Sequence, residues 1–281
     1  MAVRIFTDSA CDLELAELDA LQVELLRIPV FFDEKRYIEG ENLTREEFYE
    51  KLAVSERLPK TAQITPVEFE EAFRPYVDAG EEIVVLPLAK ELSGTYQSAC
   101  IAREQFPEAS IQVVDTRQVT FGLALLVRQA AVLRDAGQTG PEIAEEIRRL
   151  TDRVRLYAVI DDLKYLKLGG RLSSAGAVLG TLLGIKPIIC VQDGQVNCVH
   201  KVRGQKAGYA YVLEQARREG IDPTLPVCFG HSHLPDAAAE LRDMAGSLLD
   251  GCAAIHCCGI GPVVGTHAGP GCAGLAFFSR K

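Results

Sequence analysis

The chain has 281 residues, of which 48% are hydrophobic and 25% charged, a composition typical of a globular protein with one large or two ordinary domains. Its formal net charge of -9 at pH 7 argues against a nucleic-acid-binding surface, which requires a basic face. The nine cysteines show no C-x-x-C spacing and lie mostly in apolar runs. We therefore expect reduced thiols in a cytoplasmic protein that carries no secretory signal.

The first half of the chain predicts strands that alternate with amphipathic helices. We expect strands at 3–6, 23–30, 82–88 and 111–114. We expect helices at 14–21, 44–52 and 141–150, two more that begin at 66 and at about 94, and one that ends at 137. Thr44 with Glu47 forms a capping box, and Pro66 after Thr65 marks another helix start. Near-continuous apolar strands in this alternation indicate a mostly parallel sheet with helices on both faces.

The second half predicts a different layout. Asp193-Gly194 between the apolar runs 186–191 and 196–202 is typical of a β-hairpin. Further strands are expected at 156–160, 227–229, 254–258 and 275–278, and helices at 161–168, 205–219 and 236–249. These elements indicate a mixed sheet with packed helices. We place the boundary near 151–154, which gives domains 1–153 and 154–281.

The segment 251–279 has no acidic or basic residue and many glycines, and it contains His267 in the run Gly265 to Gly271, G-T-H-A-G-P-G. Glycine and proline interrupt it too often for a membrane-spanning helix. One interpretation is a tight turn between two buried strands, with the imidazole bonded to a backbone carbonyl. The other is a close approach of backbone to a ligand, whose polar head group His267 would bind.

Ser93 and Gly94 lie between a buried strand and a helix start, where ligands of open α/β sheets bind and where free N–H groups suit an anion. The alternative is that Ser93 only caps the helix. Thr61 lies in the loop before the helix that Thr65 caps, so its hydroxyl is available for another role. The residues of the loop by themselves favour the alternative, an ordinary ordered loop.

Other candidate sites carry weaker signals. Arg171 follows a glycine pair and Arg203 precedes a glycine, and together they form a candidate basic face on an acidic protein. His231 and His233 would share a strand face, but no third ligand is near, so we expect no metal. A serine-hydrolase triad of Ser93, His267 and Asp8 is conceivable, yet no G-x-S-x-G elbow is present. The absence of a P-loop argues against a small-molecule kinase.

Several segments together resemble the DegV family over essentially the whole chain. They are T-D-S-A-C-D-L at 7–13, P-K-T-A-Q at 59–63, L-S-G-T-Y-Q-S-A at 92–99, L-K-Y-L-K-L-G-G-R-L at 163–172, then I-K-P-I-I, D-G and K-V-R-G, and G-T-H-A-G-P-G at 265–271. The chain departs from the family at Ala62 and Ile64, where serine and proline are usual, while Thr61 and Gln63 are kept.

The resemblance implies a two-domain fold, with a Rossmann-like N-terminal sheet and a mixed C-terminal sheet, and a fatty acid buried between the domains. It also implies a monomeric, non-catalytic subunit without a cofactor, which presents the acid to a separate ATP-dependent kinase subunit for acyl-phosphate formation and phospholipid synthesis. Thr61, Ser93, Gly94 and His267 would bind the carboxylate, and Arg171 and Arg203 would lie at the pocket mouth or at the kinase docking surface.

Transfer free energy is consistent with such a ligand. A tail of ~15 methylenes favours burial by about 12 kcal/mol, at ~0.8 kcal/mol per methylene. Part of this favourable free energy is offset by the freedom of motion that the protein and the ligand lose on binding. The carboxylate needs hydrogen-bond donors because its desolvation is costly. The alternative function, from the same residues, is an acyl-ester serine hydrolase or another lipid-handling enzyme.

Overall fold

The computed structural model describes residues 2–173 and 184–280. Its N-terminal half contains a four-stranded sheet in the order β2-β1-β6-β7, in which every neighbouring pair is parallel. The strands are β1 (Val3–Asp8), β2 (Val23–Leu26), β6 (Glu82–Leu86) and β7 (Ile111–Val113). All five residues of β6 are buried, as a central parallel strand requires.

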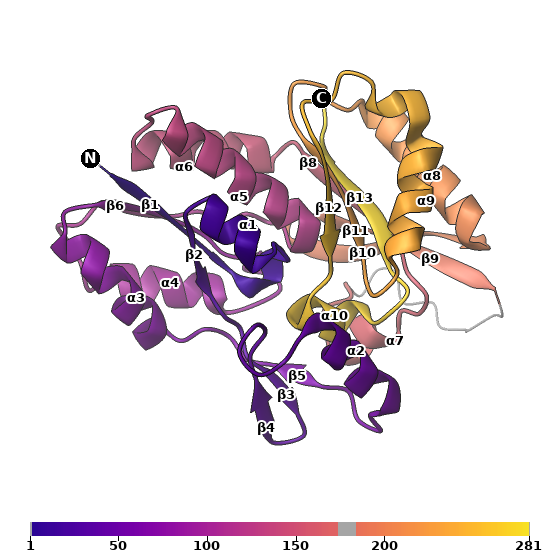
Figure 1. The fold of residues 1–281 in the computed structure, drawn as a ribbon, viewed down its shortest axis with the longest axis horizontal. Helices are drawn as coiled ribbons and strands as arrows, with labels where there is room; N and C mark the ends of the chain where they lie inside the picture. The colour runs from indigo at the N-terminus through magenta and orange to yellow at the C-terminus, as the bar shows by residue number, and fades with distance from the viewer. Residues whose placement is uncertain (1, 174–183, 281) are drawn as a thin grey trace.

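Helices cover both faces of this sheet, as predicted (Figure 1). On one face α3 packs against α4, and on the other α5 packs against α6, with α1 beside β2. The helices are α1 (Leu15–Ala20), α3 (Pro66–Asp78), α4 (Thr95–Arg103), α5 (Thr120–Asp135) and α6 (Gly140–Thr151). The predicted capping box of Thr44 with Glu47 is formed, and the predicted helix start at Thr65 is confirmed, there also with a capping box, to Glu68.

The C-terminal half contains a six-stranded mixed sheet in the order β10-β9-β8-β13-β11-β12, where only β11 and β12 pair in parallel. Its strands are β8 (Val154–Val159), β9 (Ile185–Gln192), β10 (Gln195–Arg203), β11 (Val227–His231), β12 (Ile255–Gly259) and β13 (Ala273–Phe278). The predicted hairpin joins β9 to β10. Asp193 and Gly194 both have positive φ, the backbone of a type I′ turn.

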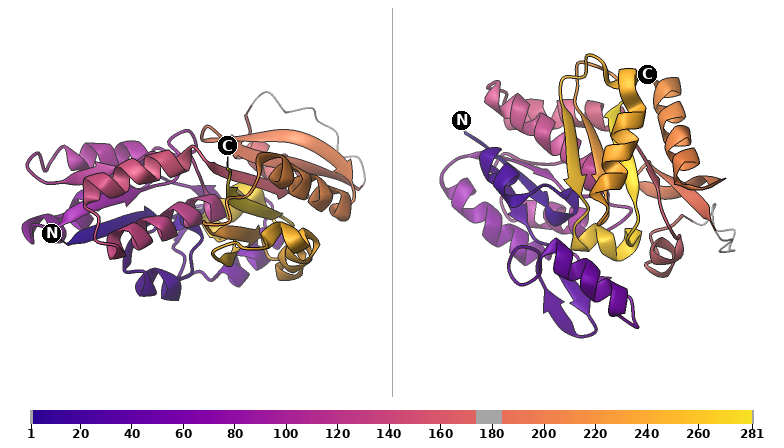
Figure 2. Two further views of the ribbon diagram at one scale, coloured as in Figure 1. Left: turned by 90° about the horizontal axis from the view of Figure 1, so that it is seen from above. Right: turned by 45° about the vertical axis from the view of Figure 1, so that its right-hand side comes forward.

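One helix joins the two halves. α8 (Gln205–Glu219) and α9 (Pro235–Ala245) cover one face of the mixed sheet, and α5 packs on the other face while also contacting β1 and β6. Consistent with this position, eleven of the sixteen residues of α5 are buried. A helix that is apolar on all sides belongs inside a protein. Figures 1 and 2 show α5 between the two sheets.

Two predicted features were wrong. The expected single strand 23–30 is divided at Pro29, and its second part forms a small antiparallel sheet, in the order β4-β3-β5, beside α2 (Arg45–Val54) (Figure 1). The strands of this sheet are β3 (Val30–Phe32), β4 (Lys35–Tyr37) and β5 (Lys60–Thr61). Pro29 has no N–H to donate and a fixed φ, and its carbonyl accepts from Ala62, so the chain leaves the first sheet before this residue and enters the second one after it.

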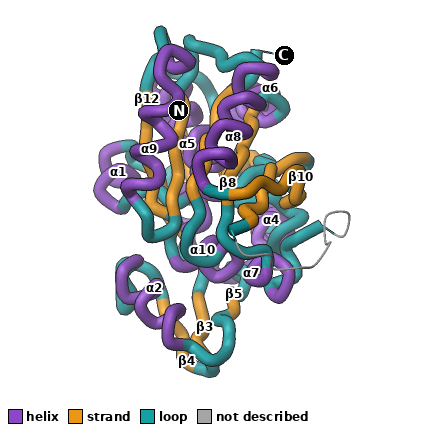
Figure 3. The backbone as a smooth tube through the Cα atoms, turned by 90° about the vertical axis from the view of Figure 1, so that its right-hand side faces the viewer, coloured by secondary structure: helices purple, strands orange, loops and turns teal. Residues whose placement is uncertain are grey.

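The segment that contains His267 is also not the tight turn that one interpretation expected. It forms a short helix, α10 (Pro262–Ala268), between β12 and β13. Pro262 occupies the first turn, and Gly269, with φ of 71°, ends the helix. α10 contacts α2, β3 and β5 of the N-terminal half as well as α7 (Lys164–Leu168) (Figure 3). The helix therefore brings His267 to the seam between the halves.

Candidate functional site

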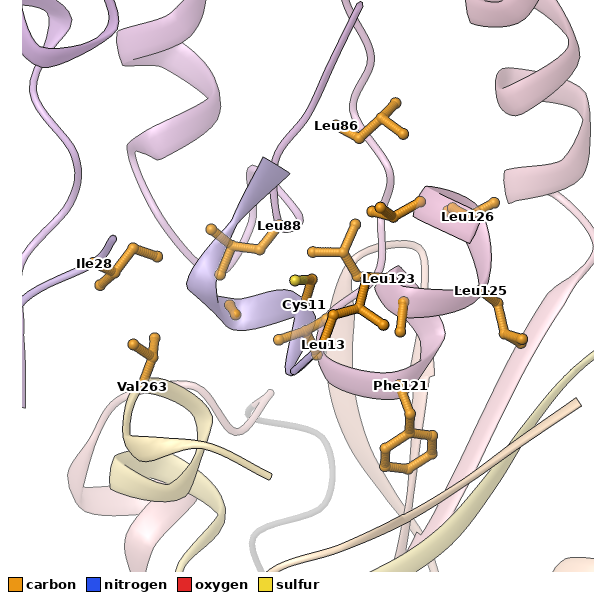
Figure 4. Close-up of a cluster of buried hydrophobic side chains, with 14 of the residues drawn as sticks. Cys11, Leu13, Ile28, Leu86, Leu88, Phe121, Leu123, Leu125, Leu126 and Val263 are labelled. Atoms are coloured by element: carbon orange, nitrogen blue, oxygen red, sulfur yellow. The ribbon is translucent and has the colours of Figure 1, made fainter. Parts of the chain in front are cut away.

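A cavity of about 270 Å³ lies between the two halves of the chain. Most of its wall is aliphatic or aromatic and comes from β-strands of the mixed sheet, from the start of α5 and from α10. The apolar residues include Ile28, Leu88, Leu92, Phe121, Leu156, Leu166, Ile189, Val191, Val196, Ile260, Val263 and Val264. In Figure 4, Val263 on α10 faces Ile28 and Leu88, while Phe121 points from α5 toward the C-terminal strands. An apolar cavity with few polar groups is the usual form of a small-molecule site.

Five of the six residues predicted for the site line this one cavity. They are Thr61, Ser93, Gly94, Arg171 and His267, which come from four separate segments of the sequence. Arg203 differs: it is exposed at the end of β10 and is not part of the cavity wall. The predicted polar cluster is therefore assembled by the fold, except for Arg203.

His267 and Thr61 are in direct contact. Nε2 of the imidazole lies 3.1 Å from the Thr61 hydroxyl oxygen, while Nδ1 is buried and has no hydrogen-bond partner among the described residues. Burial first, and then the nearby Arg171 guanidinium, lower the pKa of His267 to about 4. At neutral pH the imidazole is therefore uncharged and has one N–H to donate.

The other ring nitrogen of His267 explains why Gly169 is a glycine. A Cβ atom at position 169 would lie 2.3 Å from His267 Nδ1, which is closer than any real contact. The Arg171 guanidinium donates to the carbonyls of Gly169 and Leu92, which fixes the loop after α7 against the residue that precedes Ser93. Gly169 thus allows the imidazole to lie against this loop, and Arg171 fixes the position of the loop.

Ser93 lies both at the start of α4 and on the cavity wall. Its hydroxyl oxygen accepts a hydrogen bond from the Thr95 N–H at 3.2 Å, and it lies 3.0 Å from the Thr95 hydroxyl, so it does contribute to the start of α4. It also lines the cavity. Gly94 is the N-cap residue of α4 and lines the cavity beside Ser93.

A second hollow of about 480 Å³ adjoins the polar end of the cavity. It shares Thr61, Arg171 and His267 with the first, and it is also lined by Arg57 and Lys60. Three cationic side chains thus surround the hollow next to the predicted head-group site. An anion approaching the polar end from this side meets favourable charge.

The geometry does not assemble the hydrolase triad that the sequence allowed. Both carboxylate oxygens of Asp8 accept backbone N–H bonds, from Ala10 and Leu88, and His267 contacts Thr61 rather than Ser93. No group of three or more potential metal ligands occurs within residues 2–173 and 184–280. His231 and His233, the candidate metal pair, belong to β11 and to the turn after it; Tyr49 stacks on His233.

Sequence reasoning missed two polar residues of the cavity wall, Gln63 and Thr120. Gln63 donates to the Ser98 hydroxyl and lies over the start of α4. Thr120 is buried with φ of 51°, unusual for a β-branched residue, and its hydroxyl has no hydrogen-bond partner in the part of the chain described. A positive φ at threonine leaves no signal in a single sequence, whereas Gln63 belonged to a motif that was already noted.

No helix in the described part of the chain combines the length and the apolar character needed to cross a bilayer. The fold and the cavity together define a class: two-lobed α/β proteins that enclose an apolar ligand site with a polar end between the lobes.

The chain belongs to the DegV family. The family model, described as an uncharacterised protein of the DegV family, matches residues 2–280. A DegV domain-containing protein of Caldanaerobacter subterraneus subsp. tengcongensis is 34% identical over 99% of each chain, and one of Deinococcus radiodurans is 35% identical over 98% of each.

Solved structures support the same assignment. A fatty-acid-binding DegV family protein from Thermus thermophilus is 29% identical and superposes with a TM-score of 0.90, covering 99% of this chain and all of the other. A fatty acid binding DegV family protein from Streptococcus agalactiae, also 29% identical, has a TM-score of 0.89 over the full length of both chains. A stearic acid-binding protein from Eubacterium ventriosum is 27% identical, with a TM-score of 0.83, and covers 100% of this chain and 99% of the other.

Proposed function

We propose that this protein binds one long-chain fatty acid, with its tail in the apolar cavity and its carboxylate at Thr61, Ser93, Gly94 and His267. The observation that carries the proposal is a cavity between the two halves with a mostly apolar wall, on which Thr61, Ser93, Gly94 and His267 lie together. The similarity to proteins named for fatty acid binding supports the ligand class.

The polar end suits a carboxylate whose charge is not neutralised by a cation in direct contact. A neutral imidazole carries one N–H, and with that proton on Nε2 the ring donates to the Thr61 oxygen. The Thr61 hydroxyl hydrogen is then directed to the ligand. The Ser93 hydroxyl and the Gly94 N–H at the start of α4 supply two more donors.

We further propose that the bound acid is the substrate of a separate ATP-dependent kinase subunit, and that this chain has no catalytic activity of its own. Uncharged donors leave a carboxylate oxygen nucleophilic enough to attack a γ-phosphate. Arg57, Lys60 and Arg171, around the adjoining hollow, provide positive charge where a phosphate donor would approach. We also propose that the protein acts in the cytoplasm, and its nine free cysteines agree with this location.

Native mass spectrometry of gently purified protein tests the ligand. The proposal expects one fatty acid per chain, and its mass gives the chain length and the degree of unsaturation. Protein that carries no lipid and takes up none from a fatty acid mixture would contradict it. Incubation with ATP and a candidate kinase subunit tests the second step, because hydroxylamine traps an acyl phosphate as the hydroxamate. Labelling of Ser93 by a fluorophosphonate probe would favour a hydrolase instead.

A further inference from the structure

A pair of cysteines far from the polar end of the cavity forms a cluster that the proposed function does not use. Cys228 on β11 and Cys258 on β12 place their sulfur atoms 3.4 Å apart. Both residues are buried, with exposed fractions of 0% and 4%. Although they are thirty positions apart in the sequence, the parallel pairing of β11 with β12 makes them diagonal neighbours on one face of the sheet.

The register explains why nothing separates the two sulfur atoms. Cys228 is opposite His256, and Cys258 is opposite Gly230, which has no side chain. Cys257 points to the other face of the strand and is exposed. The chain therefore contains a thiol pair and, one residue away, an exposed thiol that cannot join it.

A single cation lies against both sulfur atoms. The Arg128 guanidinium, from α5, lies 3.8 Å from Cys228 Sγ and 3.6 Å from Cys258 Sγ. Nε and Nη2 of the same guanidinium donate to the carboxylate of Glu17 on α1 at 2.6 and 3.0 Å, so Nη2 is shared between Glu17 and Cys258. Figure 1 shows β12 beside α5 and α1, the elements that supply these two residues. A fixed positive charge favours a thiolate, and it disfavours a bound metal cation at the same place.

The hydrogen bond from Cys228 and the charge of Arg128 lower the pKa of Cys258 to about 7, whereas burial raises the pKa of Cys228. The geometry points the same way, because the Arg128 guanidinium lies closer to Cys258 Sγ, at 3.6 Å, than to Cys228 Sγ, at 3.8 Å. Cys258 is the nucleophile, since the thiolate is the reactive form, and Cys228 remains a thiol that can resolve the product.

We propose that Cys228 and Cys258 form a redox-active dithiol that a hydroperoxide converts to an intramolecular disulfide. The Cys258 thiolate attacks one oxygen of hydrogen peroxide, which breaks the O–O bond, and the displaced hydroxide takes a proton to leave as water. The resulting sulfenic acid is attacked by the Cys228 sulfur. The S–S bond forms, and the sulfenic oxygen leaves as water with the Cys228 proton. In sum, two thiols and one peroxide give one disulfide and two waters.

Closure requires the sulfur atoms to approach from 3.4 Å to a bond length of about 2.05 Å. The residue opposite Cys258 is Gly230, which has no side chain of its own, and the Phe121 ring lies against it. The new bond would tie β12, the edge strand of the mixed sheet, to β11. A thiol-containing reductant reverses the reaction by thiol–disulfide exchange.

The test treats the whole protein with one equivalent of hydrogen peroxide at pH 7, followed by alkylation and peptide mapping with two proteases. The proposal expects a mass loss of about two daltons, a linked peptide pair containing Cys228 and Cys258, and recovery with dithiothreitol. Cys228→Ala and Cys258→Ala each abolish the link, and the matched control Cys257→Ala keeps it. Arg128→Lys keeps the positive charge but loses the planar guanidinium whose two nitrogens reach the two sulfur atoms. We expect this variant to react several-fold more slowly at pH 7.

Three results would overturn the proposal: no linked peptide from the unmodified chain, a disulfide that involves Cys11 instead, or oxidation confined to Cys257. Because the first measurement needs no substitution, a variant that fails to fold does not remove the test.

Discussion

Ser93 has two roles in this structure, at the start of α4 and on the cavity wall, and a substitution separates them. We expect Ser93→Ala to weaken fatty acid binding about tenfold or more, because a hydrogen bond to a charged group contributes about 1.5–3 kcal/mol. Gly94 remains as the N-cap, so the fold should persist. Titration calorimetry measures the affinity. Ser247→Ala, in the exposed 3₁₀ turn η3 (Gly246–Leu249), is the matched control. Equal affinity in the two variants would remove Ser93 from the site.

The protonation state of His267 is a second property of a single residue. Burial and Arg171 lower the pKa of His267 to about 4, against an ordinary value near 6.5. We expect its imidazole nitrogens to titrate near pH 4 in the lipid-free protein, as followed by ¹⁵N chemical shifts. Arg171→Gln should raise the midpoint, since one positive charge is lost. A midpoint near 6.5 in the unmodified protein would contradict the neutral head-group site.

At the scale of elements, the contact between α5 and β11 fixes how closely the two halves approach. A Cβ atom at Gly230 would lie 2.0 Å from the Phe121 ring, so alanine there must displace Phe121 or the strand. We expect Gly230→Ala to lower the free energy of unfolding by about 1–3 kcal/mol, the usual cost of overpacking. Chemical denaturation measures it.

The double variant Phe121→Ala with Gly230→Ala is the control for this clash. Removal of the ring should make the glycine substitution less costly, which appears as a coupling energy between the two positions. An additive result would mean that Gly230 and Phe121 do not constrain one another.

The elements that sequence patterns could predict were those with local signals. The capping boxes of Thr44 and Thr65 and the Asp193-Gly194 hairpin depend on neighbouring residues, and all three are formed. The small sheet of β3, β4 and β5 could not be predicted, because its strands have only two or three residues each, and β5 joins β3 from the far side of α2 in the sequence.

For the site, the resemblance to a family supplied the residues that the fold then brings together. Thr61, Ser93 and His267 are separated by up to 206 positions, and no periodicity in one sequence would join them. The neutral state of His267 and the positive φ of Thr120 depend on burial and on tertiary packing. Neither property can be derived from the residue type.

At the scale of the whole molecule, a buried polar network connects the halves. Asp12 accepts a hydrogen bond from the Gly261 N–H, and Arg45 donates to Glu14, Glu39 and the Gly259 carbonyl. The seam between the halves is thus stabilised by charge as well as by the apolar packing of α5. The division into domains 1–153 and 154–281 stays a prediction, although the two large sheets take their strands from opposite sides of that boundary.

This network predicts how stability depends on pH. Burial raises the pKa of Asp12 to about 8, although Arg45 opposes the shift. In the unfolded chain an aspartate titrates near 3.9, so between these values the folded state holds the extra proton. The free energy of unfolding should therefore fall as pH rises from about 4 to about 8, by up to about 1.4 kcal/mol per pH unit for this group.

Asp12→Asn is the variant that isolates this group, since asparagine also tolerates the left-handed backbone at this position, where φ is 56°. Urea denaturation at several pH values should show a shallower slope in the variant. Burial raises the pKa of Asp8 to about 7. Below that pH, Asp8 therefore still contributes to the pH dependence of stability in the variant. Identical slopes for the two proteins would mean that Asp12 is not protonated in the folded state.

A crystal structure of the protein with a saturated C16 fatty acid tests the central claim most directly. The account predicts an acyl chain enclosed between the two halves against Phe121 and Val263, with the carboxylate within hydrogen-bond distance of the Thr61 and Ser93 hydroxyls. A fatty acid bound outside this cavity, or one with its carboxylate at the opposite end, would contradict it.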